Sequence, residues 1–173
     1  MAVDLVGYSA LAEIDESAAV GEVARMRGQL EGIVGPEGGR IFNTAGDGFM
    51  LEFASASGAL AAAEKLCGAM ERQRVRIGVH LGDVLIARAA IYSATASISP
   101  RGLQQAAKPG AIVVSVDVQR AVRGALASRL HSNGAVRLEK MAETIEIFHT
   151  GSGVRETHAP PQRGHPRRAA VRQ

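Results

Sequence analysis

The sequence is poor in cysteine and in aromatic residues, and each shortage excludes a class of protein. Its single cysteine, Cys67, leaves no pair for a disulfide within the chain. Cys67 lies in an alanine-rich segment with helical spacing, so we expect a small core residue rather than a nucleophile. Tryptophan is absent and aromatic residues make up 3% of the chain, which leaves the predicted sheet without the stacking rings of an RNA-binding domain. We therefore expect no nucleic-acid partner.

Long apolar segments are also missing from the chain. No apolar run approaches the roughly 18 residues of a membrane-spanning helix. The start, MAVDLVGYS, has no basic segment before its first acidic residue, unlike a signal peptide. We therefore expect a cytoplasmic protein with no membrane span. The 173 residues suit one domain with a core of ordinary size.

The excess of basic residues is confined to the C-terminal tail. The net charge is +3, and residues 155–173 carry five arginines against Glu156, a sum of +4 that leaves −1 for the rest of the chain. This tail is also rich in proline and has almost no apolar residues, which predicts disorder. We expect a folded domain over residues 1–150 and a basic, disordered tail over residues 151–173. A solvated linker is favoured over a segment that binds phosphates or an acidic membrane.

Apolar spacing and helix-breaking residues predict an α+β protein with helices packed on a mainly antiparallel sheet. A very short first strand, residues 1–3, precedes Asp4. We expect helices over residues 10–34, 55–73, 100–107 and 116–126. We expect strands over residues 41–42, 49–53, 75–87, 111–115, 135–138 and 144–148, with Gly82-Asp83 turning the 75–87 segment into a partner strand.

Asp47 stands between Gly46 and Gly48 in the segment RIFNTAGDGFMLEF, where two apolar runs meet. Glycine and aspartate both tolerate the backbone conformations of a tight turn, so this segment predicts a β-hairpin. A hairpin alone would explain the aspartate. A ligand-binding role for Asp47 needs a second acidic residue nearby.

Asp4 is the candidate for that second acid, since it ends the first predicted strand and precedes a turn into a helix. The start of a helix offers unpaired N–H groups and positive dipole charge, which can bind phosphates. A role of Ser9 as helix N-cap and of Gly7 as a turn residue explains the same pattern equally well. If the first strand neighbours the hairpin, Asp4 and Asp47 can hold Mg²⁺ on a triphosphate. The candidate phosphate-binding residues are Leu5, Val6, Gly7, Tyr8 and Ser9.

Six motifs occur in order along the chain. They are DLVGYS (4–9), GGRIFNTAGDGFMLEF (38–53), RIGVHLGDV (76–84), IY (91–92), PGAIVVS (109–115) and LEKMAETIEIF (138–148). With them, the sequence resembles the class III nucleotidyl cyclase catalytic domain of adenylate and guanylate cyclases, from Asp4 to about Phe148. The resemblance implies a ferredoxin-like or palm-like fold and a nucleoside triphosphate substrate, with ATP favoured over GTP.

The resemblance also implies a metal centre and a homodimer. Asp4 and Asp47 would each bridge two Mg²⁺ or Mn²⁺ ions, so that the ribose 3′-oxygen attacks the α-phosphorus and pyrophosphate leaves. In this family the metal-binding aspartates belong to one subunit, and an Asn and an Arg four residues apart belong to the other. Ser97 and Arg101 occupy those positions here. Serine offers one donor where asparagine offers two, and Pro100 indicates that the helix begins at Ser99-Pro100. Arg101 is equally compatible with a solvated arginine at a helix start.

The positions that select the base differ from the family pattern. Adenine-specific members carry Lys and Asp where this chain has Asn43 and Ala90, and guanine-specific members carry Glu and Cys. Asn43 can hydrogen-bond a purine edge, whereas Ala90 offers only apolar contact. The family's triphosphate-binding lysine aligns with Glu139, and the adjacent Lys140 is the candidate to replace it.

Two functions therefore remain open. The first is an active nucleotidyl cyclase, which the two surviving aspartates favour slightly. The second is a degenerate cyclase-homology domain that serves as a nucleotide-binding or regulatory module, because each lost donor costs about 2.7 to 4 kcal/mol of transition-state stabilisation. A diguanylate cyclase is excluded by the tip sequence, since Gly48 stands where that family has a second acidic residue.

Overall fold

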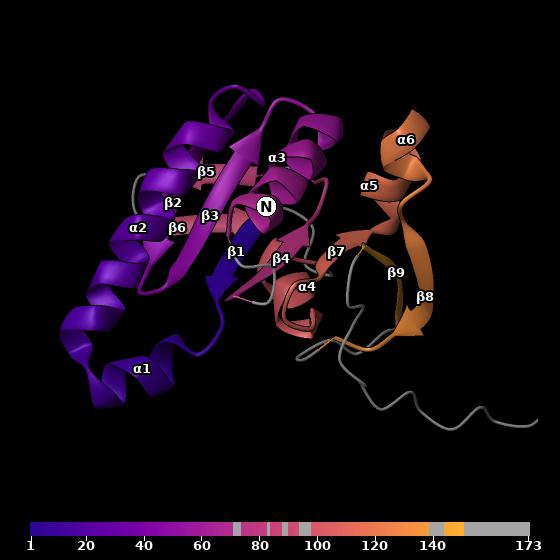
Figure 1. The fold of residues 1–173 in the computed structure, drawn as a ribbon. Coiled ribbons are helices and arrows are strands. Elements are labelled where there is room, and N and C mark those ends of the chain that lie inside the picture. Colours follow the sequence, from indigo (N-terminus) through magenta and orange to yellow (C-terminus); the bar gives the residue numbers. More distant parts are fainter. Residues whose placement is uncertain (71–73, 83, 88–89, 94–97, 139–143, 151–173) are drawn as a thin grey trace, which may run out of the picture.

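The computed structural model describes residues 1–70, 74–82, 84–87, 90–93, 98–138 and 144–150 (Figure 1). Its strands are β1 (Ala2–Leu5), β2 (Gly39–Ala45), β3 (Gly48–Phe53), β4 (Val75–Val79), β5 (Val84–Ala87), β6 (Ala90–Ser93), β7 (Ile112–Ser115), β8 (His131–Val136) and β9 (Ile145–Thr150). Its helices are α1 (Tyr8–Ile14), α2 (Glu16–Val34), α3 (Ala56–Ala69), α4 (Pro100–Ala106), α5 (Val116–Ala121) and α6 (Gly124–Ala127). The predicted tail, residues 151–173, lies outside the described residues.

The described strands form a sheet in the order β2-β3-β1-β4-β7-β9-β8 and a separate pair, β5-β6. Neighbours in the large sheet are antiparallel except β4 and β7, which are parallel. The predicted α+β class with a mainly antiparallel sheet is confirmed. No helix in the described part of the chain has the length and apolar character that crossing a membrane requires.

Apolar side chains that point to opposite faces of the sheet form two separate cores. Val3 and Leu5 of β1 belong to the larger core, which also contains buried residues of α2 and α3. Leu103 and Ala106 of α4 belong to a second core. Successive strand residues point to opposite faces, so Asp4 lies on the other face from Val3 and Leu5. Figure 1 shows α2 and α3 along the sheet near β2 and β3, and α4 near β4 and β7.

Three expected elements differ from the observed ones. The helix predicted over residues 10–34 is divided at Asp15, whose extended backbone ends α1 and whose carboxylate accepts the N–H of Ala18 at 2.9 Å to begin α2. The helix predicted over residues 116–126 is divided into α5 and α6, with Gly124 at a φ of 64°. The strand predicted over residues 75–87 is divided into β4 and β5, and β5 pairs with β6; Asp83 of the predicted turn lies outside the described residues.

Helix α4 approaches the sheet closely over Gly78 of β4. A Cβ atom on Gly78 would lie 2.1 Å from the carbonyl oxygen of Pro100 and 2.3 Å from the amide nitrogen of Gln104. Only glycine permits the helix backbone to lie this close to the strand. The glycine thereby sets the position of the α4 side chains relative to β1 and β4.

Candidate functional site

Asp4 and Asp47 lie at the same end of the sheet. Asp4 of β1 is the register partner of Gly48, the residue that follows Asp47 in the turn between β2 and β3. Gly46 has a φ of 60°, a left-handed conformation that glycine adopts without strain. The predicted hairpin is therefore present, and its turn holds Asp47 next to the strand that carries Asp4.

The negative charge of Asp4 acts on the neighbouring Asp47 carboxyl. Burial raises the pKa of the half-buried Asp47 carboxyl, and the negative charge of Asp4 and a hydrogen bond with Asp4 raise that pKa further. The positive charge of Arg76 acts in the opposite direction. A cation bound between the two carboxylates would offset the repulsion between their negative charges.

Arg76 forms an ion pair with Asp4. The two residues are register partners on the neighbouring strands β1 and β4, and their side chains are 20% and 18% exposed respectively. Arg76 was not among the predicted site residues. The available signal was that Arg76 alternates with apolar residues within RIGVHLGDV, which places it on the opposite face of the strand from them. That signal becomes informative only once β4 is known to lie beside β1.

A cavity of about 200 Å³ is lined by both aspartates and by residues of α4. Arg101, Gln104 and Gln105 of α4 line it together with Asp4 and Asp47. The Nη2 atom of Arg101 lies 3.9 Å from the position of a Cβ atom on Gly48. Arg101 is therefore gathered with the aspartates of its own chain, whereas the resemblance implied that it serves the partner's aspartates.

The start of α4 agrees with the prediction from Pro100. Ser99 is the N-cap residue, its hydroxyl accepts the N–H of Gly102 at 3.0 Å, and Pro100 occupies the first turn. The helix begins at Pro100, so Ser97 precedes α4 in the chain. Ser97 itself lies outside the described residues.

Gln104 is a residue of this cavity that the sequence did not point to. The residue is 5% exposed, and its Nε2 atom is buried without a hydrogen-bond partner among the described residues. A glutamine between the buried Leu103 and Ala106 was the signal, since polar residues on the buried face of a helix are uncommon.

The turn between β1 and α1 is built around Gly7. Gly7 has a φ of 81° and is the N-cap residue of α1, so Ser9 lies inside the helix and no side chain caps α1. The N–H of Val6 donates to the carbonyl oxygen of Arg74 at 2.8 Å. The predicted turn is present, but Ser9 is not its cap and the Val6 amide is already bonded.

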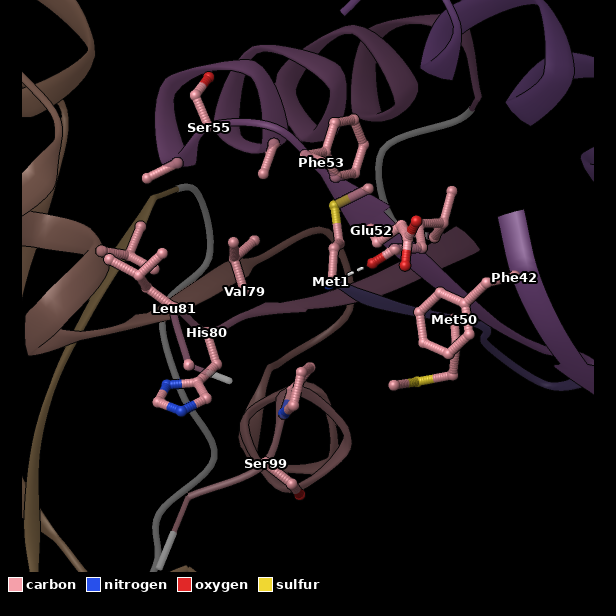
Figure 2. A pocket seen from close by; sticks show the side chains of 16 residues that line it. Met1, Phe42, Met50, Glu52, Phe53, Ser55, Val79, His80, Leu81 and Ser99 are labelled. Carbon is pink, nitrogen blue, oxygen red and sulfur yellow. Dashed lines mark hydrogen bonds between the residues drawn. The ribbon is translucent and has the colours of Figure 1, made fainter. Parts of the chain in front are cut away.

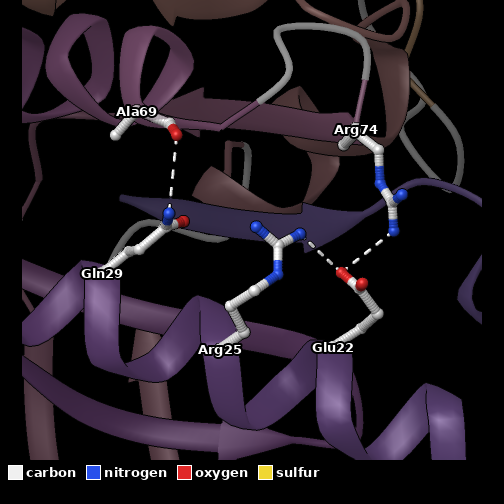
Figure 3. A network of polar contacts seen from close by, with 5 residues as sticks. All are labelled: Glu22, Arg25, Gln29, Ala69 and Arg74. Atoms are coloured by element: carbon white, nitrogen blue, oxygen red, sulfur yellow. Dashed lines mark hydrogen bonds and ion pairs between the residues drawn. The ribbon is translucent and has the colours of Figure 1, made fainter.

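A cavity of about 460 Å³ lies beside this turn, lined by Leu5, Val6, Gly7, Tyr8, Leu11, Glu22 and Arg74. Glu22 accepts ion pairs from Arg25 at 2.6 Å and from Arg74 at 3.0 Å (Figure 3). The hydrogen bond from Arg25 lowers the pKa of the Glu22 carboxyl. These contacts tie α2 to the start of β4 beneath the turn.

Of the remaining predicted residues, only Asn43 has a described side chain, and it does not join the aspartates. Asn43 is an exposed residue of the edge strand β2, next to a register shift, and does not line the aspartate cavity. Ala90 begins β6, but its side chain lies outside the described residues, as does all of Lys140.

A further cavity, of about 220 Å³, lies around the end of β4 and is mainly apolar (Figure 2). Met1, Phe42, Met50, Phe53 and His80 are among its lining residues. The Nδ1 atom of His80 lies 3.0 Å from the hydroxyl of Ser115, and burial lowers the pKa of His80. This cavity contains neither aspartate.

The donor set of the aspartate cavity fits a divalent cation that shares its coordination with phosphates. Within the described residues, no group of three or more His, Cys, Asp or Glu side chains could hold a metal ion. Mg²⁺ needs fewer protein ligands than that, because it is commonly bound by one or two carboxylates together with water and phosphate oxygens. Asp4 and Asp47 supply those carboxylates.

Comparison with known proteins identifies the fold. No family model matches the chain. It is 30% identical over 172 residues to "Putative adenylate cyclase 3" of Rhizobium meliloti (strain 1021). The alignment covers 93% of this chain and 29% of that relative. The chain thus spans less than a third of that protein.

Solved structures show the same architecture. The adenylate/guanylate cyclase/hydrolase from Silicibacter pomeroyi has a TM-score of 0.73 and 26% identity, over 86% of this chain and 92% of that one. The guanylate cyclase domain of RhGC from Catenaria anguillulae in complex with GTP has a TM-score of 0.68 and 12% identity, over 91% of this chain and 94% of that one.

Proposed function

We propose that this chain, which has the fold of class III adenylate and guanylate cyclase catalytic domains, is itself a nucleotidyl cyclase. It converts a nucleoside triphosphate, ATP in preference to GTP, to the 3′,5′-cyclic nucleotide and pyrophosphate. The observation that carries the proposal is the placement of Asp4 and Asp47 side by side at one end of the sheet. The names of the relatives, and the GTP in one of them, support the substrate class.

The reaction requires one bond to form and one to break. The ribose 3′-oxygen loses its proton and bonds to the α-phosphorus, while the bond from that phosphorus to the bridging oxygen of pyrophosphate breaks. Two Mg²⁺ or Mn²⁺ ions held by Asp4 and Asp47 would lower the pKa of the 3′-hydroxyl and offset the triphosphate charge. The rest of the work falls to side chains of this chain.

Two arginines, Arg76 and Arg101, lie where the proposed site would hold the negatively charged phosphates of the substrate. Arg76 neutralises Asp4 in the free protein, and once a cation takes that carboxylate its guanidinium becomes available to a phosphate oxygen. Arg101 lines the same cavity from α4 and would offset the charge that develops on the α-phosphoryl group. We assign Arg101 to the site of its own chain because its guanidinium lies near Gly48.

Binding of the rest of the nucleotide rests on the family resemblance. The turn of Leu5, Val6, Gly7, Tyr8 and Ser9 would bind the outer phosphates through backbone N–H groups other than that of Val6. Asn43 would hydrogen-bond the purine and Ala90 would contact it, while Lys140 and Ser97 would assist at the triphosphate. The proposed enzyme is a homodimer, in which the second subunit covers the bound nucleotide. A cytoplasmic location fits a substrate drawn from the cell's triphosphate pool.

The direct test is product formation by the purified protein. We expect cyclic AMP from ATP with Mn²⁺ or Mg²⁺, less cyclic GMP from GTP, and no product from D47A. A matched control is E13Q, which removes an exposed carboxylate of α1 and should leave the rate unchanged. Absence of product from both nucleotides at high protein concentration would refute the proposal.

A degenerate, nucleotide-binding module is the second candidate, and two observations favour it. Asp4 is already neutralised by Arg76, and the base-selecting position is occupied by Ala90. This candidate predicts binding of Mn²⁺ and ATP, measured by calorimetry, without any cyclic product.

A further inference from the structure

One carboxylate of α2 joins that helix to the residue that directly precedes β4. The Oε2 atom of Glu22 pairs with Arg25 of its own helix at 2.6 Å and with Arg74 at 3.0 Å (Figure 3). The side chains of Glu22 and Arg74 are 26% and 37% exposed respectively. The pair with Arg25 stays within one helix, whereas the pair with Arg74 connects the helix to the sheet.

Arg74 also holds the turn that follows β1. Its main-chain carbonyl oxygen accepts the N–H of Val6 at 2.8 Å, directly beyond Leu5 and Val75, the last register pair of β1 and β4. At Val6 the chain leaves the sheet and enters the turn of residues 5–9, which is proposed above to bind phosphates. Arg74 therefore contacts α2 through its side chain and the turn through its main chain.

The turn has few other attachments. Gly7 has a φ of 81°, and α1 begins after it without a side-chain cap. No residue of α1, all of which the structure describes, is buried. A segment with so little buried surface opens easily, so the hydrogen bond from Val6 matters for its position. Main-chain N–H groups that are already oriented bind an anion at a lower cost in entropy.

The charged pair borders the space into which the turn faces. Glu22 and Arg74 line the cavity of about 460 Å³ together with residues 5–8 of the turn. A change in this pair is therefore expected to alter the turn before it alters the distant parts of the fold.

We propose that Glu22 is a positioning residue for the turn of residues 5–9, because it holds Arg74, whose carbonyl oxygen accepts the Val6 N–H. This inference rests on the nucleotide site proposed above and deepens it. Glu22 acts through Arg74 and does not itself contact the substrate.

The test compares E22Q and R74M with the control E31Q. Glu31 pairs with Arg27 at 3.6 Å on the same helix, and neither residue lines the cavity beside the turn. Calorimetry measures the affinity for tripolyphosphate in the presence of Mn²⁺. We expect E22Q and R74M each to weaken this affinity about two- to fivefold, in keeping with a partly exposed ion pair, and E31Q to leave it unchanged.

The direction of the two effects separates positioning from charge alone. E22Q removes a negative charge beside the turn and R74M removes a positive one, so charge alone would strengthen phosphate binding in E22Q and weaken it in R74M. Positioning weakens binding in both, and the double variant should be no weaker than either single variant. Tighter or unchanged binding by E22Q would overturn the inference and leave the proposed function standing. If the wild-type protein binds neither tripolyphosphate nor ATP, the proposed function is overturned and the inference with it.

The cyclase assay gives a second readout. We expect the KM for ATP to rise about two- to fivefold in E22Q with an unchanged kcat, because the phosphates are held less well while Asp4 and Asp47 are unaltered. A lower kcat with an unchanged KM would count against a role in the turn.

Amide hydrogen exchange reports on the turn in the free protein. We expect the Val6 N–H to exchange about two- to fivefold faster in E22Q and R74M than in the wild-type protein and E31Q. The Ile77 N–H, which donates to the carbonyl oxygen of Ala111 at 3.2 Å, is the reference and should keep its rate. Equal rates for Val6 in E22Q and the wild-type protein would overturn the inference.

Discussion

Asp47 combines a structural and a chemical role that conflict in the free protein. Its position in the turn is favourable, but its charge lies next to that of Asp4 and is partly buried. The pKa of the Asp47 carboxyl is raised in the folded state, so the folded protein binds this proton more tightly than the unfolded chain does. The carboxylate therefore costs stability once the pH rises above the unfolded value of about 3.9, and the cost is complete above the folded pKa.

D47N should accordingly stabilise the metal-free protein at pH 7, with a melting temperature higher by a few degrees. The same substitution should abolish cyclase activity, because one of the two cation ligands is lost. Thermal unfolding followed by circular dichroism, alongside product assays, checks both effects. D15N is the matched control, since asparagine caps a helix as well as aspartate does. A lower melting temperature for D47N would show that the two carboxylates do not repel each other.

Gly78 offers a second test at the residue scale. G78A places a methyl group 2.1 Å from the Pro100 carbonyl, so α4 must move outward. We expect a loss of about 1 to 3 kcal/mol in unfolding free energy and weaker nucleotide binding, because Arg101 moves with the helix. Urea unfolding and calorimetry measure these effects.

G28A is the control for G78A. Gly28 is exposed within α2, and a Cβ atom there would meet nothing within 4 Å. Alanine at this position should stabilise the protein by about 0.5 to 1 kcal/mol. Equal effects of the two substitutions would contradict the close contact between α4 and β4.

At the scale of elements, local chemistry in the sequence predicted the parts of the site that depend on one segment. The hairpin that carries Asp47 and the start of α4 at Pro100 were predicted correctly, because turn and capping preferences act over a few residues. The division at Asp15 was missed, although aspartate followed by Glu16 and Ser17 is a helix-start signal, because apolar spacing continues across it.

Strands β8 and β9 form an element whose stability should depend on pH. His131 and His149 are register partners with ring centroids 6.0 Å apart. Burial lowers the pKa of His149, and the charge of His131 lowers it further. The unfolded chain then binds protons more readily than the folded one. Stability is therefore complete above about pH 6.5 and decreases as the pH falls from there to the folded pKa.

H131Q should raise the pKa of His149 and reduce this loss of stability in acid. Titration of the histidine ring protons by NMR measures the pKa, and urea unfolding at pH 7.5 and at pH 5.5 measures the loss. His80 is the internal control, because its lowered pKa arises mainly from burial and not from His131. An unchanged pKa of His149 would show that the two rings do not interact.

At the scale of the whole molecule, the site draws on segments that are distant in the sequence. Asp4 comes from β1, Asp47 from a hairpin, Arg76 from β4, and Arg101 and Gln104 from α4. The resemblance identified the first two and Arg101. Arg76 and Gln104 were not predicted, because their signals in the sequence become informative only once it is known which strands are neighbours and how closely α4 approaches β4.

Mixing two inactive variants tests whether the two aspartates and Arg101 of one active site come from the same chain. D47N and R101A are each expected to be inactive. Because Arg101 lies with the aspartates of its own chain, we expect an equimolar mixture, unfolded and refolded together, to remain inactive. Recovery of about a quarter of the wild-type rate would instead place Arg101 in the partner's site. Light scattering should give the mass of a dimer for the wild-type protein and for both variants.

The places of the two acidic residues in the sheet differ in one respect that bears on ion selectivity. Asp4 belongs to β1, which is hydrogen-bonded to a strand on each side, while Asp47 belongs to a tip formed by the outermost strand, β2, and its neighbour. The backbone separation of the two residues therefore changes more readily through bending of that hairpin than through movement of β1. To bind ions of different radius, such as Mg²⁺, Mn²⁺ and Ca²⁺, the hairpin turn has to bend by different amounts. The stiffness of this one turn would therefore contribute to the preference for one ion over another.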